Sequence, residues 1–230
     1  MNQGIIIAID GPAGSGKSTT ARLVAQKLGY LYIDTGAMYR AVTLAWLNAK
    51  IELTEENVAH LLDTIKIELK QGQNQQIVLL NGIDVSDSIR QPEVTKYVSP
   101  ISAMKNVRDF LVAQQREIGN YGGVVMDGRD IGTVVFPNAE LKIFLIATPE
   151  ERAKRRQKEQ LEKGINQDFE SILKSIIDRD NYDSTREISP LRKAEDAIEL
   201  DTTNLSINEQ CEFVVEKAKK IISRFNRFCG

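Results

Sequence analysis

Short apolar segments alternate with longer amphipathic ones along most of this chain. Five of the short segments are predicted to be buried strands, at residues 4–9, 30–33, 123–126, 141–147 and 197–200. A helical pattern follows each strand, and this alternation is typical of a parallel sheet covered by helices. We therefore expect an α/β fold with a five-stranded parallel sheet and helices on both of its faces.

Between about residues 62 and 99 the pattern changes. Residues 65–70 alternate apolar and polar side chains, as a half-buried strand does, and residues 77–80 offer a partner strand. Residues 71–74 between them read Gln-Gly-Gln-Asn, which predicts a hairpin loop. We expect residues 62–99 to form a small β-rich insert, not an independent domain.

Composition narrows the class of protein. A chain of 230 residues suits one sizeable domain, or a core with a small insert. Its net charge of −2 gives no reason to expect binding to nucleic acid. Two cysteines, Cys211 and Cys229, make no disulfide framework and indicate a reducing compartment. No signal peptide or membrane-spanning run is evident, so we expect a cytoplasmic protein, and a monomer by default.

Residues 11–18 read Gly-Pro-Ala-Gly-Ser-Gly-Lys-Ser directly behind the first predicted strand. This is the phosphate-binding loop motif in the strand–loop–helix context that it requires. Its glycines let backbone N–H groups converge on phosphate oxygens, Lys17 binds the β- and γ-phosphates, and the Ser18 hydroxyl ligates the Mg²⁺ carried by ATP. A glycine turn that only reverses the chain would explain neither the Lys-Ser pair nor the strand. The candidate ATP-binding residues are Gly11, Pro12, Ala13, Gly14, Ser15, Gly16, Lys17, Ser18 and Thr19.

Two arginines, Arg40 and Arg129, follow strands whose carboxyl ends should lie beside this loop, where ligands bind in open parallel sheets. Arginine holds phosphate through a bidentate fork and keeps its charge. Two like unit charges about 4 Å apart repel by about 4 kcal/mol at an effective dielectric constant of about 20. A phosphorylated acceptor that meets ATP therefore needs several cations, whereas a GTPase, whose nucleophile is water, needs fewer.

The chain offers no obvious nucleophile–base pair. Its single histidine, His60, lies in an Ala-His-Leu-Leu stretch that is typical of helix packing. A hydrolase would need such a pair. A phosphate monoester does not, because its second pKa is about 6 and it is mostly dianionic at neutral pH. Catalysis then consists of alignment and charge stabilisation, and the residues favour a kinase with a phosphorylated acceptor.

Further motifs follow the phosphate loop in order: Asp-Thr-Gly-Ala-Met-Tyr-Arg at 34–40, Asn-Gly-Ile-Asp-Val at 81–85, Asp-Gly-Arg-Asp-Ile-Gly-Thr at 127–133 and Lys-Ile-Phe-Leu at 142–145. With the loop, they resemble the bacterial cytidylate (CMP) kinase family over nearly the whole chain. Thr35 stands where some members have serine, which keeps the hydroxyl. The resemblance implies transfer of the γ-phosphoryl group from ATP to CMP, and to dCMP, in pyrimidine nucleotide metabolism.

The resemblance also implies a P-loop NTPase-type kinase core at residues 1–61 and 100–230, a nucleoside monophosphate (NMP)-binding insert at 62–99 and a lid around 150–190. Arg152, Arg155 and Arg156 would belong to a mobile lid that closes over ATP and keeps water out. A charged run of this kind fits a solvated helix face equally well.

The same resemblance assigns roles within the acceptor site. Arg40, Arg129 and Arg186 would hold the CMP phosphate and the transferring group, and Arg179 and Asp183 would contact the sugar. Thr35 joins the substrate-binding residues. The implied catalytic set is Lys17, Arg40, Arg129, Arg179 and Arg186.

The cytosine edge would be read by Ser99, Arg108 and Asp130. Cytosine offers an amino donor at N4 and acceptors at N3 and O2, so a carboxylate and a guanidinium complement it. Uracil has an acceptor in place of the amino group and would face Asp130 unfavourably. Without the resemblance, Asp130 and Asp183 are equally well explained as surface or capping carboxylates.

Two matters stay open at this stage. Asp127, at the end of an apolar strand, could hold Mg²⁺ through water or could orient the following Gly-Arg-Asp turn. The chain could also be a kinase for UMP or for a non-nucleotide alcohol, or a nucleotide-dependent switch whose phosphate loop gates a partner. An acceptor screen separates these functions.

Overall fold

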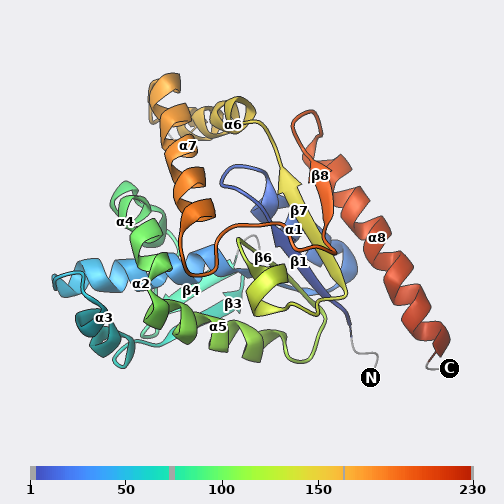
Figure 1. The fold of residues 1–230 in the computed structure, drawn as a ribbon, viewed down its shortest axis with the longest axis horizontal. Helices are drawn as coiled ribbons and strands as arrows, with labels where there is room; N and C mark the ends of the chain where they lie inside the picture. Colours follow the sequence, from blue (N-terminus) through green and yellow to red (C-terminus); the bar gives the residue numbers. More distant parts are fainter. Residues whose placement is uncertain (1–3, 73–75, 163, 229–230) are drawn as a thin grey trace.

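The computed structural model describes residues 4–72, 76–162 and 164–228 (Figure 1). Five parallel strands form the main sheet, in the order β2-β6-β1-β7-β8. The predicted five-stranded parallel sheet is confirmed. Residues 73–74 of the predicted hairpin loop, and Cys229, lie outside the described residues. The strands are β1 (Ile6–Asp10), β2 (Leu31–Asp34), β6 (Val124–Gly128), β7 (Leu141–Ile146) and β8 (Ile198–Asp201).

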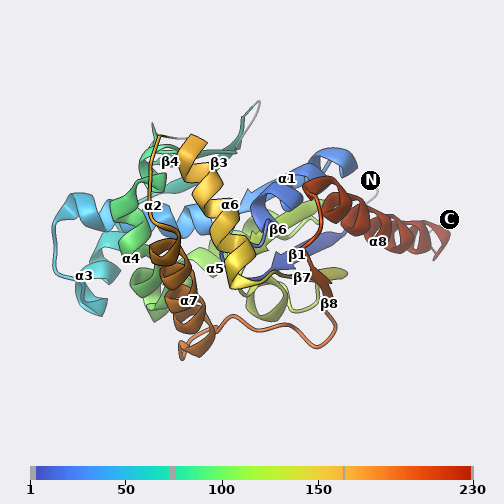
Figure 2. The same ribbon diagram turned by 90° about the horizontal axis from the view of Figure 1, so that it is seen from above.

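Helices cover both faces of this sheet (Figures 1 and 2). On one face lie α1 (Lys17–Leu28) and α8 (Ile207–Phe228), and on the other lie α5 (Lys105–Gly119) and a short π-helix, η2 (Ile131–Val135). Successive side chains of a strand point to opposite faces, so Ile7 and Ile9 pack toward α1 and α8, and Ala8 packs toward α5. A strand buried on both faces must be apolar throughout, which is the pattern that predicted β1.

The segment between β2 and α5 carries the smaller sheet. Its elements are α2 (Thr35–Ala49), α3 (Glu55–Leu62), β3 (Ile67–Gln71), β4 (Gln76–Leu80), β5 (Ile83–Asp84), the 3₁₀-helix η1 (Ser88–Arg90) and α4 (Pro92–Ala103). Strands β3, β4 and β5 form an antiparallel sheet that packs with α2, α3, α4 and α5 in one apolar cluster.

The expectation of a β-rich insert holds for only part of residues 62–99. Strands β3 and β4 lie where alternation predicted them, but α4 begins at Pro92 and continues to Ala103. Proline suits the first turn of a helix, where its missing N–H has no partner to lose. A second proline, Pro100, lies inside α4. Because a proline at such a position usually marks the end of a helix, the sequence did not predict α4. The division of the chain at residues 62 and 99 stays a prediction.

Helices α6 (Pro149–Glu162) and α7 (Phe169–Thr185) stand together beyond the carboxyl ends of the main strands (Figure 1). A small apolar cluster of Ala153, Ile172 and Ile176 joins them. This pair occupies most of the region predicted as a lid, a role that stays a prediction. None of the helices in the described part of the chain is both long and apolar enough to span a membrane.

One side chain, Gln76, links the small sheet to the main one. Its Nε2 donates to the carbonyl oxygen of Tyr32 at 2.6 Å, and its Oε1 accepts from the Asp34 amide at 3.0 Å. Strand β2 is an edge of the main sheet, and an edge strand leaves such backbone groups without a ladder partner. The Gln76 amide therefore substitutes for a neighbouring strand at the point where α2 begins.

We expect Gln76→Leu to lower the free energy of unfolding by about 1–3 kcal/mol, because it leaves two half-buried backbone groups without partners. Urea unfolding measures the change, and faster amide hydrogen exchange at Asp34 locates it. Gln71→Leu is the matched control, since Gln71 lies directly opposite Gln76 in the ladder and is exposed. Equal effects of the two substitutions would show that the link carries no stability.

Candidate active site

The phosphate loop joins β1 to α1 in a conformation that requires glycine. A side chain at Gly11 would bring its Cβ to 2.2 Å from the carbonyl oxygen of Leu145. Gly16 precedes α1 with a φ of 91°, in the left-handed region. The loop therefore presents backbone N–H groups next to the N-terminus of α1, an arrangement that favours anions.

Lys17 opens α1 and is buried beneath this loop. Its Nζ donates to the carbonyl oxygen of Pro12 at 2.7 Å. Burial, followed by the nearby positive charge of Arg129, lowers the pKa of Lys17 to about 7, although Asp127 and Asp10 oppose the shift. A bound polyphosphate would favour the charged ammonium again, because an anion close to a lysine raises its pKa.

Asp127 lies in β6 beside the phosphate loop. Its Oδ2 accepts from the Ser18 hydroxyl at 2.8 Å, and its Oδ1 accepts from the Tyr32 hydroxyl at 2.9 Å. Burial and the neighbouring Asp34 raise the pKa of Asp127 to about 6. Its carbonyl oxygen accepts from Thr35 Oγ1 at 2.7 Å. The carboxylate thus faces the hydroxyl expected at the metal, while the backbone orients the start of α2, so both roles considered for Asp127 remain compatible with the structure.

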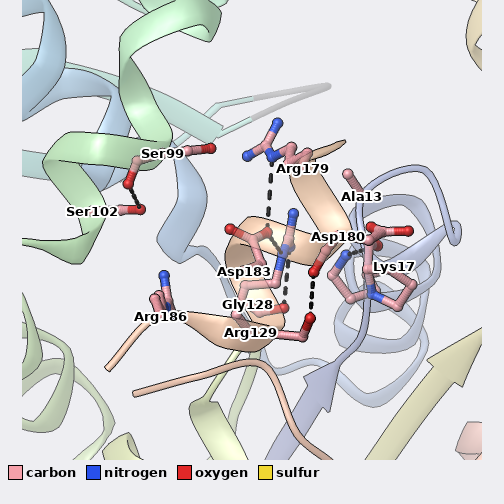
Figure 3. Close-up of polar contacts among 12 residues, drawn as sticks. Ala13, Lys17, Ser99, Ser102, Gly128, Arg129, Arg179, Asp180, Asp183 and Arg186 are labelled. Atoms are coloured by element: carbon pink, nitrogen blue, oxygen red, sulfur yellow. Dashed lines mark hydrogen bonds and ion pairs between the residues drawn. The ribbon is translucent and has the colours of Figure 1, made fainter. Parts of the chain in front are cut away.

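A carboxylate from α7 gathers two of the predicted arginines (Figure 3). Oδ2 of Asp183 accepts from Arg129 Nε at 2.8 Å and lies 3.8 Å from Arg179 Nε. Burial alone would raise the pKa of Asp183, but Arg129 and Arg179 outweigh that effect and hold it below its usual value. In Figure 3 this group lies between Lys17 on one side and Arg186 and Ser99 on the other.

These arginines carry more positive charge than the carboxylate neutralises. Burial, then Arg129, lowers the pKa of Arg179 to about 10, with Arg40 and Arg156 acting in the same direction and Asp183 against it. Within the described residues, four buried guanidinium nitrogens have no hydrogen-bond partner: Nε of Arg40, Nε of Arg108, Nε of Arg179 and one terminal nitrogen of Arg186. Buried donors without acceptors are costly, so the cluster favours an anionic ligand.

Arg108 and Asp130, two of the residues predicted to read the base, contact each other in the structure, and their role toward a base stays a prediction. Arg108 of α5 donates to Oδ2 of Asp130, and both side chains are buried. Arg108 also donates to the carbonyl oxygen of Ser102 at 3.2 Å and lies 5.4 Å above the centre of the Tyr39 ring. Ser99, on α4, accepts from the Ser102 hydroxyl through its carbonyl oxygen. Its own role toward a base stays a prediction.

A cavity of about 410 Å³ opens beside Arg186. It lies between the end of α4 and the end of α7, and its lining residues are Ala103, Tyr182, Thr185, Arg186, Glu187 and Ile188. The guanidinium of Arg186 also donates from Nε to the carbonyl oxygen of Ser189 at 2.8 Å, which fixes the loop after α7. The cavity therefore adjoins Arg186, which is predicted to hold the acceptor phosphate.

Thr35 and Arg40 are both tied to the start of α2. The Thr35 hydroxyl is engaged with the Asp127 backbone, and its contact with a substrate stays a prediction. Arg40 donates to Asp34 Oδ2 at 3.0 Å, and the other oxygen of Asp34 caps α2 by accepting from the Ala37 amide at 2.9 Å. Asp34 stood in a recognised motif, but its role in holding Arg40 was missed, although the two residues are only six apart in sequence.

The charged run on α6 divides into different roles. Arg152 is buried and donates to the carbonyl oxygen of Ala13 at 3.0 Å and to Asp180 at 2.5 Å, so it supports the phosphate loop and is not part of a solvated face. Arg155 donates to the carbonyl oxygen of Thr202 at 2.6 Å, beyond the end of β8. Arg156 contributes to the positive field at Arg179. The contacts of Arg155 and Arg156 with ATP stay predictions.

Lys17 supplies a pH-dependent prediction. At about pH 8 a lysine with a pKa of about 7 is mostly neutral, so an anion that restores its charge should draw up to about one proton from solution. We expect calorimetry of ATP binding, in buffers of different ionisation enthalpy, to detect this uptake. The Lys17→Arg variant should lose it, because a guanidinium is charged throughout. Equal proton uptake by both proteins would contradict the assignment to Lys17.

Comparison of the sequence and the structure with known proteins identifies the family of this chain. A sequence model of the cytidylate kinase family matches residues 7–220. The chain is 53% identical over 224 residues to cytidylate kinase from Bacillus cereus (strain ATCC 10987 / NRS 248), covering 97% of this chain and 98% of the relative. It is 53% identical over 223 residues to cytidylate kinase from Bacillus anthracis (strain CDC 684 / NRRL 3495), covering 96% and 97%. An uncharacterized protein from Eubacterium ventriosum ATCC 27560 shares the fold, with a TM-score of 0.51 at 14% identity, covering 94% of this chain and 98% of that one. The chain belongs to the cytidylate kinase family.

Proposed function

We propose that this protein transfers the γ-phosphoryl group of ATP to CMP, giving CDP and ADP, and accepts dCMP as a second substrate. The observation that carries the proposal is the group of buried guanidinium nitrogens without hydrogen-bond partners, those of Arg40, Arg179 and Arg186 among them; Arg179 lies close enough to Lys17 of the phosphate loop to lower its pKa. A site that binds only ATP has little use for this second basic cluster. Two phosphorylated ligands that must approach each other need it.

The reaction requires alignment more than proton transfer. The loop and Lys17 hold the β- and γ-phosphates, and Arg40, Arg129 and Arg186 hold the phosphate of CMP. An oxygen of that phosphate attacks the γ-phosphorus, and the bond from the γ-phosphorus to the bridging oxygen of ADP breaks. The attacking oxygen is already anionic, so no general base is needed.

The chain's oxygen donors suit Mg²⁺. This cation prefers oxygen ligands, and the Ser18 hydroxyl hydrogen-bonded to the Asp127 carboxylate supplies two of them at the phosphate loop. Ser18 would ligate the ion directly, and Asp127 would hold Ser18 and the water around the ion. When bound, Mg²⁺ neutralises charge on the β- and γ-phosphate oxygens.

Asp130 and Arg108 account for a preference for cytosine. The Asp130 carboxylate accepts from the N4 amino group, and Arg108 donates to the ring acceptors. Ser99 joins them from α4. Asp183 contacts the sugar through the oxygen that Arg129 leaves free, together with Arg179. Arg155 and Arg156 contribute to closure over ATP.

The deciding experiment is a coupled assay of ADP release with ATP and Mg²⁺, run in parallel on CMP, dCMP, UMP, AMP and no acceptor. We expect fast turnover confined to CMP and dCMP. Equal rates with UMP would remove the base-reading roles of Asp130 and Arg108 but keep the kinase. Slow ADP release that ignores every acceptor would overturn the kinase and favour a nucleotide-dependent switch.

Arg129→Ala should lower kcat by about 10²–10³-fold, because it removes a donor that meets the charge of the transferring group. Affinity for a fluorescent ATP analogue should change little, since the loop and Lys17 remain. Arg192→Ala is the matched control, because Arg192 is an exposed arginine outside the cluster. Near-normal kcat in Arg129→Ala would remove this residue from the catalytic set.

A further inference from the structure

Asp10 is a buried carboxylate for which the proposed reaction has no use. It is the last residue of β1 and directly precedes Gly11 of the phosphate loop. Its Oδ1 accepts from the Ile131 amide at 2.9 Å, and its Oδ2 accepts from the Gly132 amide at 2.7 Å. Both oxygens are thus committed to one short stretch of backbone that lies 121 and 122 residues away in sequence.

That stretch is the first part of η2, which begins immediately after Asp130. The carbonyl oxygen of Asp130 accepts from the Val134 amide at 2.9 Å and from the Val135 amide at 3.2 Å, so the turn closes on Asp130 itself. A single π-turn is rare and is found mostly at functional sites. By holding the first two N–H groups of the turn, Asp10 fixes the backbone from which the Asp130 side chain projects.

The position calls for a carboxylate in particular. The two backbone hydrogen bonds favour the ionised form of Asp10. Burial and the nearby Asp130 oppose it and raise the pKa of Asp10 to about 7. Replacing Asp10 by asparagine would keep the size of the side chain, but one of its two polar ends is an NH₂ donor. The NH₂ group of asparagine would then face a backbone N–H, and neither of these two donors would have an acceptor. Only a side chain with two acceptors satisfies both amides.

We propose that Asp10 is a positioning residue for base selection, which holds the turn that presents Asp130 to the acceptor base. This inference rests on the proposed CMP kinase function. The Asp130 carboxylate must meet the N4 amino group of cytosine, and it would repel the acceptor that uracil carries at the same place. A displacement of about 1 Å in a reacting complex can cost about 10²-fold, so selection depends on how firmly the turn is held.

The test is Asp10→Asn, assayed with CMP and UMP. We expect the ratio of kcat/KM for CMP to that for UMP to fall about tenfold or more, while the Kd of a fluorescent ATP analogue changes by less than about threefold. Thr20→Val is the matched control, because Thr20 is a buried polar residue of α1 whose hydroxyl donates to Gln210 Oε1 at 2.9 Å. It should leave the ratio unchanged. A proportionate loss with CMP and UMP in Asp10→Asn would overturn the inference.

A double-substitution cycle separates positioning from general damage. If Asp10 acts through Asp130, then Asp10→Asn should lower the CMP:UMP ratio in the native background but not in the Asp130→Asn background. Independent, additive losses would mean that Asp10 affects selection by another route and would contradict the inference. A native protein without any preference for CMP over UMP would refute the proposed base reading first, so the two failures are distinguishable.

Should Asp10→Asn not fold, the native protein provides the decisive measurement. Exchange of the Ile131 and Gly132 amides with solvent requires their bonds to Asp10 to open. CMP, by engaging Asp130, should slow their exchange about tenfold or more, whereas UMP at the same saturation should slow it less than about threefold. Equal slowing by the two nucleotides would overturn the inference.

Discussion

The structure depends on holding several positive charges together at a largely buried site. Arg129 lies close enough to lower the pKa of both Lys17 and Arg179, Arg179 also lowers that of Lys17, and Asp183 offsets only part of this charge. Repulsion of this kind persists only where the surrounding framework over-determines the side chains. Substrate phosphates would reduce the repulsion between these cations. The same positive cluster can therefore contribute both to substrate affinity and to stabilisation of the transition state.

Carboxylates at the ends of neighbouring strands make this arrangement possible. Strands β2, β6 and β1 lie side by side, and their carboxyl ends carry Asp34, Asp127 and Asp10. Each holds a different part of the site: Asp34 holds Arg40 and caps α2, Asp127 holds Ser18, and Asp10 holds the turn after Asp130. Because all three project from one rigid sheet, they fix the phosphate loop, the acceptor phosphate site and the base site relative to one another.

Local features were readable in the chain, and features made by several elements were not. The phosphate loop and the five strands depend on residues close in sequence, so their patterns predicted them. Helix α4 escaped prediction because Pro100 interrupts its pattern, and only packing in a shared apolar cluster with α2 and α5 supports the helix there. The role of Asp10 was not predicted, because its partners are more than a hundred residues away.

By itself, the sequence determined the fold class, the phosphate loop and the family, because alternating apolar segments and a contiguous motif carry that information locally. The tertiary structure alone decided which charges meet. Asp183 joins Arg129 across 54 residues, and Arg108 reaches Asp130 across 22. Such pairs form only after the sheet and its helices have packed, since packing brings the partners together and their mutual attraction must offset the cost of burying their charges.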